Sequence, residues 1–333
     1  MSRSVLVQAV CDSIRRAPRL VHRAAWICVV LSPLLLSCGS SSSMPGAQAP
    51  LVHAAVQDLP VDLDVVVRFD LRRIRDVLPQ PLFELLLDLG LEYYGATLFQ
   101  AEIEQTEVLW IGFRSLPGDS RSASGFEGDY VWVLEGKFPS ETPRTWRDRF
   151  FPARDLGAGY LRYDAKQTTN RFQAGRVYEK VGERLVIASA AEVDAVEKVI
   201  ERHHFARSVV PQERGAISFA ANTRRLAQTL GERSPKIAAV LERALSATGH
   251  MNITQQSAEL HSRISFDRHD DALVGQDALR IVIALLLSLE SVDASDTDNA
   301  LNNAGFHLQV VERDLVIRIE YQLPDLMAWL GFS

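Results

Sequence analysis

Hydrophobic and polar residues alternate in short runs that begin soon after residue 60. Residues 65–69, VVVRF, place every second side chain on one apolar side, which predicts a β-strand. Asp70 follows, and an aspartate at that point is a preferred helix N-cap. Apolar residues in 71–78 then recur at helical spacing until Pro79. The pattern predicts a strand that leads directly into a helix.

The same order returns about 150 residues further along the chain. Residues 217–221, ISFAA, alternate as a strand, and Asn222 is in position to cap a helix over residues 223–230. A second helix is expected after each of these units, from Pro81 to the glycine at position 90 and from Pro235 to the glycine at position 249. This order of strands, caps and breakers predicts an internal duplication.

The ends of the two units also agree. Leu-Val-Ile occurs at 185–187 and again at 315–317, each time in the second strand of a predicted hairpin that leads into a helix. Ser189 and Glu192 have the spacing of a capping box for the first of these helices. We therefore expect an α+β fold of two related tandem halves, 58–207 and 208–333. Each half should be a mostly antiparallel sheet with helices packed on one face.

The N-terminal part of the chain has a different pattern. Residues 1–25 carry five arginines and one acid, and they precede the apolar run AAWICVVLSPLLLS. A basic region followed by an apolar run too short for a comfortable membrane span is typical of an export signal. A polar stretch, GSSSSMPGAQAP, begins directly after Cys38.

Leu35-Leu36-Ser37-Cys38 resembles the lipobox of bacterial lipoproteins. The resemblance covers only the signal, and no family is recognised for the rest of the chain. It implies cleavage before Cys38 and attachment of diacylglycerol, with palmitate or a similar acyl chain, to the Cys38 thiol. Residues 1–37 would be the signal peptide and 38–57 a flexible tether. Gly39 after the anchor implies outer-membrane sorting, facing the periplasm, if the cell is Gram-negative.

Charge and cysteine content narrow the classes of partner. Removal of residues 1–37 takes five of 36 basic and one of 42 acidic residues, which leaves 31 against 41 and a net charge of −10. An acidic domain without a basic stripe is a poor binder of nucleic acid. The three cysteines are Cys11, Cys28 and Cys38, so we expect no disulfide, no cysteine-bound metal and no cofactor in the exported domain.

Ser120 is a candidate catalytic nucleophile. Gly118-Asp119-Ser120 resembles the nucleophile block of one hydrolase class, in which a serine on a firm turn is served by a later histidine and acid. Arg121 stands where that block has an apolar residue, and the expected late Asp-x-x-His is absent. A Gly- and Ser-rich hairpin loop between two strands explains these residues better, so no catalytic residue is assigned.

Other polar and apolar motifs have simpler structural explanations. The adjacent His203 and His204 would point in different directions on a helix, and the acids of 267–271 suit the first turn of a helix. The acidic run 293–305 lacks the glycine and terminal glutamate of a calcium loop, so no metal site is predicted. The apolar run 278–290 and the aromatic residues Trp110, Tyr130 and Trp132 are expected in the core.

The sequence thus predicts a membrane-anchored lipoprotein of the cell envelope with a non-enzymatic binding or interaction domain. Its partners would be membrane lipid, through acylated Cys38, and an envelope protein of unknown kind. Two alternatives stay open at this point: an envelope hydrolase that uses the Ser120 loop, and a carrier of a hydrophobic ligand. A carrier would need an apolar cavity between sheet and helices.

Overall fold

The structure is a computed structural model of the chain. It describes residues 57–60, 62–80, 83–84, 99–115, 128–138, 149–157, 159–167, 174–202, 211–230, 235–288 and 305–322.

The described residues form strands and helices in a mixed order. The strands are β1 (Val65–Asp70), β2 (Thr106–Ser115), β3 (Gly128–Gly136), β4 (Arg154–Gly157), β5 (Tyr160–Asp164), β6 (Ala174–Lys180), β7 (Arg184–Ser189), β8 (Ile217–Ala221), β9 (Ala244–Ile253), β10 (Ser257–Phe266), β11 (Phe306–Val311) and β12 (Asp314–Gln322). The helices are α3 (Leu71–Val77), α5 (Gln100–Glu104), α7 (Val193–Arg202), α8 (Thr223–Leu230), α9 (Pro235–Arg243) and α10 (His269–Ser288).

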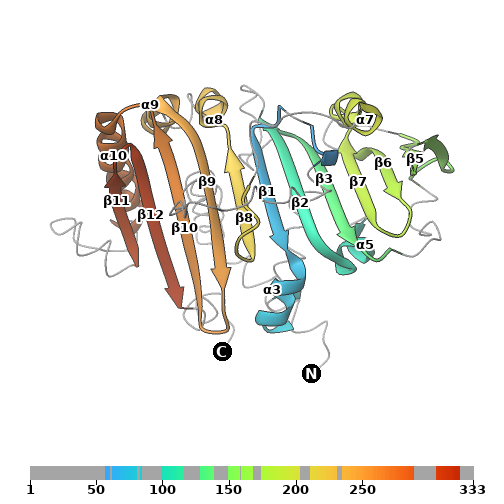
Figure 1. The fold of residues 1–333 in the computed structure, drawn as a ribbon, viewed down its shortest axis with the longest axis horizontal. Coiled ribbons are helices and arrows are strands. Elements are labelled where there is room, and N and C mark those ends of the chain that lie inside the picture. The colour runs from blue at the N-terminus through green and yellow to red at the C-terminus, as the bar shows by residue number, and fades with distance from the viewer. Residues whose placement is uncertain are drawn as a thin grey trace, which may run out of the picture.

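All of these strands belong to one sheet, and every pairing between neighbours is antiparallel. The spatial order is β11-β12-β10-β9-β8-β1-β2-β3-β7-β6-β5-β4, with β8 and β1 side by side near the middle (Figure 1). The expected class, a mixed fold with an antiparallel sheet and helices, is therefore correct. The expectation of a separate sheet in each half is wrong, because β1 pairs with β8 and so joins all the strands into one sheet.

The β1–β8 pair has a reciprocal register. Val65 lies opposite Ala221, and Phe69 lies opposite Ile217. Beyond the paired residues, the Asp70 N–H donates to the Ala216 carbonyl at 2.7 Å, and the Asn222 N–H donates to the Asp64 carbonyl at 2.7 Å. The hydrogen bond at one end of the pair thus has a counterpart at the other end.

Helices lie on both faces of the sheet, contrary to the expected single face. Side chains of successive residues in a strand point to opposite faces. Leu109 and Ile111 of β2 pack with Leu71 and Ile74 of α3, whereas Trp110 packs with α7. The wide sheet is apolar on both sides here, so it needs cover on both.

The part of the sheet formed by strands β8 to β12 packs against α8, α9 and α10, on the same face of the sheet as Val65 and Val67 of β1. Its opposite face is polar: along β10, the residues between Ala258, Leu260, Ser262 and Ile264 are Glu259, His261 and Arg263, all partly exposed. The strict alternation of buried and partly exposed residues in β10 explains why this strand was predictable.

The expected helix from Pro235 to Gly249 is wrong at its C-terminal end. Helix α9 ends at Arg243, and Ala244–Ile253 is strand β9. Gly249 lies in the middle of that strand opposite Phe219, whose ring occupies the space that a side chain at residue 249 would need. Pairing with β8 and β10 on both sides outweighs the helix preference of Ala244 and Ala247.

Several local predictions are confirmed. Asp70 caps α3, with its Oδ1 accepting from the Arg73 N–H at 3.0 Å, and Asn222 caps α8 in the same way through the Arg225 N–H at 3.3 Å. Helix α10 begins at His269 with Asp270 and Asp271 in its first turn. Trp110, Tyr130 and Trp132 are buried, and Leu279 of the apolar run is buried too.

Some expectations fall elsewhere. The short strands β4 and β5 were not predicted. Most of the expected 81–90 helix, the expected C-terminal helix after β12 and the side chains of 281–288 lie outside the described residues. Among the described helices, no helix combines the length and the hydropathy that crossing a bilayer requires.

Candidate functional site

The first described residues of the chain, 57–60 and 62–64, are held tightly on the sheet. Leu59 and Leu63 are buried among Trp110, Val131 and Val133. Gly112 of β2 makes room for Leu63, since a side chain at residue 112 would occupy the space of the Leu63 methyl group. Packing of these two leucines thus fixes the backbone next to Asp58, Asp62 and Asp64.

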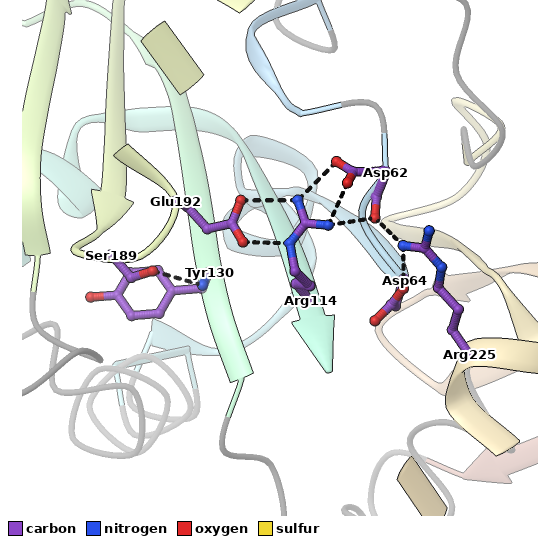
Figure 2. Close-up of polar contacts among 7 residues, drawn as sticks. All are labelled: Asp62, Asp64, Arg114, Tyr130, Ser189, Glu192 and Arg225. Atoms are coloured by element: carbon purple, nitrogen blue, oxygen red, sulfur yellow. Dashed lines mark hydrogen bonds and ion pairs between the residues drawn. The ribbon is translucent and has the colours of Figure 1, made fainter. Parts of the chain in front are cut away.

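Arg114 of β2 lies at the centre of the polar contacts around this segment. Its guanidinium donates to both carboxylate oxygens of Asp62, at 2.6 and 2.8 Å, and to both of Glu192, at 2.6 and 3.2 Å. Figure 2 shows Arg114 between the two carboxylates, with Glu192 on one side and Asp62 on the other. Such two-pronged contacts between arginine and carboxylate are the strong class of ion pair.

Arg225 of α8 reaches the same segment from the second part of the chain. Its Nη1 donates to the Asp62 carbonyl at 2.6 Å and to Asp64 Oδ1 at 3.1 Å (Figure 2). The side chain of Asp64 is only 3% exposed, whereas that of Arg225 is 45% exposed. The arginine therefore brings charge to a carboxylate that has little contact with water.

Asp58 is held by a third arginine. Arg184 of β7 donates to Asp58 Oδ2 at 2.6 Å, and the Tyr160 hydroxyl donates to the same oxygen at 2.9 Å. Both charged side chains are buried. Burial, followed by the nearby Asp58 charge, raises the pKa of Tyr160 well above its ordinary value, so its hydroxyl stays a donor.

We call these three pairs the aspartate clamp: Asp58 with Arg184, Asp62 with Arg114, and Asp64 with Arg225. The hydrogen bonds from Arg114 hold the pKa of Asp62 below its usual value. The bonds to Asp62 and Glu192 raise the pKa of Arg114. Asp62 and Arg114 thus stay charged at neutral pH, and the clamp ties residues 57–60 and 62–64 to strands β2 and β7 and to helix α8.

The predicted capping box is wrong, and its two residues have other partners. Ser189 Oγ accepts from the Tyr130 N–H at 3.2 Å, and the Glu192 carboxylate binds Arg114 (Figure 2). Helix α7 starts at Val193, directly after Glu192. Tyr130 itself is a core residue, and burial raises its pKa to about 12.

A second cluster of titratable groups lies on the polar face of β9, β10 and β12. The rings of His250 and His261 stack at 5.2 Å between centroids. Glu259 accepts from His261 at 2.9 Å and pairs with Arg318 at 2.5 Å. Burial, His261 and Arg214 all lower the pKa of His250.

The residues singled out in the sequence are mostly not brought together. Cys38, Ser120, His203, His204 and residues 293–304 lie outside the described residues. In the motif 267–271, the imidazole Nδ1 of His269 contacts the Glu312 carbonyl, and Asp271 pairs with Arg243 at 3.1 Å. Within the described part of the chain, no three histidine, cysteine or acidic side chains are grouped so as to hold a metal.

Sequence reasoning missed the aspartate clamp. The run DLPVDLDVVV does contain a signal, because three aspartates are interleaved with two leucines just before the first strand. Its partners Arg114, Arg184 and Arg225 carry no local mark, since they lie 52, 126 and 161 residues from the aspartates they bind.

Comparison with known proteins adds a likeness of limited extent. No protein-family model matches the chain, and no curated protein matches its sequence. Crystal form I of TP0453 aligns over 87% of this chain and 100% of its own, with 9% identity and a TM-score of 0.46. Crystal form IV of TP0453 aligns over 84% and 96%, with 8% identity and a TM-score of 0.44. These values supply no argument about function.

Proposed function

We propose that this chain is a lipid-anchored lipoprotein of the cell envelope, whose folded part is a non-enzymatic binding or interaction domain. The observation that carries the proposal is the lipobox-like run Leu35-Leu36-Ser37-Cys38 at the end of an apolar segment. Its implied partner is membrane lipid through acylated Cys38, on the periplasmic side of the outer membrane if the cell is Gram-negative. An envelope protein would be the second partner.

The aspartate clamp supports an anchored function. Residues 39–56 separate Cys38 from the first described residue, and Asp58, close to that residue, is bound to the sheet by Arg184. A domain held by its N-terminal end needs that end to be firmly joined to the rest. Three ion pairs from β2, β7 and α8 supply such a junction.

The pairing of charges supports a non-enzymatic domain. General acid–base or nucleophilic catalysis needs a group that is free to react, in reach of a substrate. In the aspartate clamp each carboxylate is bound by an arginine, and both carboxylates around Arg114 accept two hydrogen bonds. The arrangement serves cohesion.

Metabolic labelling tests the anchor. Cells that express the full chain are grown with a clickable fatty acid, and the protein is isolated and its label measured. Wild type and Cys28→Ser should be labelled, because Cys28 lies in the segment that cleavage removes. Cys38→Ser should carry no label. Label on Cys38→Ser, or none on the wild type, would refute the proposal.

We further propose that the fold consists of two related halves, 58–207 and 208–333. Three features support this. Asp70 and Asn222 cap the helices that follow β1 and β8. The two caps also hold matching places in the β1–β8 pair, since the Asp70 N–H bonds the residue before β8 and the Asn222 N–H bonds the residue before β1. Outward from that pair, β1-β2-β3-β7-β6 has the same connection order as β8-β9-β10-β12-β11.

The repeated Leu-Val-Ile sequence adds to this support. Residues 185–187 lie in β7 next to β3, and 315–317 lie in β12 next to β10. Val131 of β3 pairs with Ala188, the residue directly after the first Leu-Val-Ile run. His261 of β10 pairs with Arg318, the residue directly after the second run. Identical residues therefore hold corresponding ladder positions.

A further inference from the structure

The two ends of the sheet differ in how their edge strands are protected. At one end, β4 has four residues, two of them charged, and a register irregularity. At the other end, β11 has six residues, FHLQVV, without Lys, Arg, Asp, Glu or Pro. Short, bulged and charged strands discourage pairing with another chain, whereas a longer uncharged edge invites it.

The hydrogen-bond register shows which groups of β11 face away from the sheet. The Glu320 N–H donates to the Gly305 carbonyl at 3.1 Å, and Gly305 precedes the Phe306–Ile319 pair. Hydrogen-bonded pairs alternate along an antiparallel ladder. His307 and Gln309 therefore bond to β12, and the backbone groups of Leu308 and Val310 point outward.

Helix α10 covers part of this outward edge. Phe306, Leu308 and Val310 belong to the apolar cluster that contains Ala272 and Leu279 of α10. From the same helix, Gln276 Nε2 donates to the Leu308 carbonyl at 3.0 Å. Figure 1 shows α10 beside β11 at the end of the sheet.

We infer that Gln276 guards the edge of β11 against pairing with a second copy of this chain. Its side chain occupies the central outward carbonyl of the strand, which a partner strand would need. Without it, two copies can pair antiparallel through Leu308 about a two-fold axis, as isologous contacts require. Exposed Leu273, Val274 and Val311 lie on the same helix and strand, and their apolar surface would favour that contact.

The test compares single and double variants of the full chain, extracted from membranes in a mild detergent. Sedimentation velocity over a concentration series should find the wild type monomeric. Gln276→Ala should shift toward a dimer, with the weight-average mass rising toward twice that of the monomer. Gln276→Ala/Val311→Lys should return to the monomer, because a lysine on the edge strand opposes pairing. Gln80→Ala, which removes a Gln–Glu84 side-chain contact away from the edge, is the matched control.

The possible outcomes separate clearly. A wild type that already dimerises and is made monomeric by Val311→Lys overturns the inference, and so does a Gln276→Ala variant that stays monomeric. Association that Val311→Lys leaves unchanged, or that Gln80→Ala shows equally, also counts against it. If Gln276→Ala does not fold, Gln276→Met replaces it, since methionine keeps the length and helix preference but cannot donate the hydrogen bond.

Discussion

At the scale of single residues, Arg114 contributes more to the stability of the fold than the sequence around it indicates. The side chain of Glu192 is only 3% exposed, so it depends on Arg114 to compensate its negative charge and to donate hydrogen bonds to its carboxylate. Removal of one partner of a buried pair leaves an uncompensated charge, which costs far more than the pair itself contributes.

Arg114→Ala should therefore lower the free energy of unfolding by about 3 kcal/mol in a urea titration. The double variant Arg114→Ala/Glu192→Gln should recover part of that loss, because the remaining amide is neutral. Arg114→Lys should fall between wild type and Arg114→Ala, since a lysine cannot bind two carboxylates in two-pronged fashion. A loss below about 0.5 kcal/mol, typical of a surface change, would contradict the role given to Arg114.

The contacts of Ser189 and Glu192 show why residue-level prediction stopped short. Serine followed by glutamate three residues later favours a capping box, and Glu192 does directly precede a helix, but Ser189 is the last residue of β7. Their side chains instead bind Tyr130, 59 residues away, and Arg114, 78 residues away. A local motif cannot compete with partners that only the folded sheet brings near.

At the scale of elements, strand-to-helix junctions were predictable because their signals are local. A cap residue, an alternating run before it and a helical run after it suffice for β1 with α3 and for β8 with α8. The first part of strand β9 was predicted as helix, because its first residues, ALSA, favour a helix when they are considered without their tertiary contacts. Its neighbours β8 and β10 decide the conformation, and their contribution cannot be read from nearby residues.

The two helix caps should not be equal in strength. Asn222→Ala should lower the free energy of unfolding by about 1 kcal/mol, as the loss of a cap does. Asp70→Ala should cost more, because Asp70 Oδ2 also pairs at 3.1 Å with Arg68, whose side chain is 9% exposed. Urea titrations of both variants measure the difference, with Asp277→Ala on α10 as an exposed control. Equal costs would mean that the Arg68 contact contributes nothing.

The β9–β10 hairpin should make stability depend on pH. The pKa of His250 is lowered from 6.5, so the folded protein binds fewer protons than the unfolded chain. Stability is then fully present above about pH 6.5 and is lost as pH falls through the folded pKa. Burial lowers the pKa of His250 most, the nearby His261 and Arg214 lower it further, and Glu259 raises it.

Thermal unfolding from pH 8 to pH 5 measures this effect. The melting temperature of His250→Gln should fall less than that of the wild type below about pH 6.5, because glutamine has no charge to gain. His307→Gln, an exposed histidine on β11, serves as the control and should follow the wild type. Parallel curves for wild type and His250→Gln would show that His250 does not govern the acid response.

At the scale of the whole molecule, the order of the strands in the sheet could not be predicted from the sequence. The fold class and most strands followed from alternation, but β4, β5, the first residues of β9 and the joining of all the strands into one sheet did not. The β1–β8 contact joins residues about 150 positions apart, and helices cover both faces of the first part. Each of these is a consequence of how elements meet, which periodicity does not specify.

We propose that the molecule is held at its N-terminal end by lipid on Cys38. The described residues begin at the aspartate clamp, and we propose that the residues before it are a flexible tether and a lipid-modified Cys38. If that claim is correct, the mature chain begins at Cys38 and its first residue bears lipid.

Mass spectrometry of the N-terminal peptide of the membrane-extracted protein tests this most directly. The account predicts a peptide that begins at Cys38 and carries diacylglycerol on sulfur, with no peptide from residues 1–37. A mature chain that retains those residues, or that begins at an unmodified residue on either side of Cys38, would contradict it.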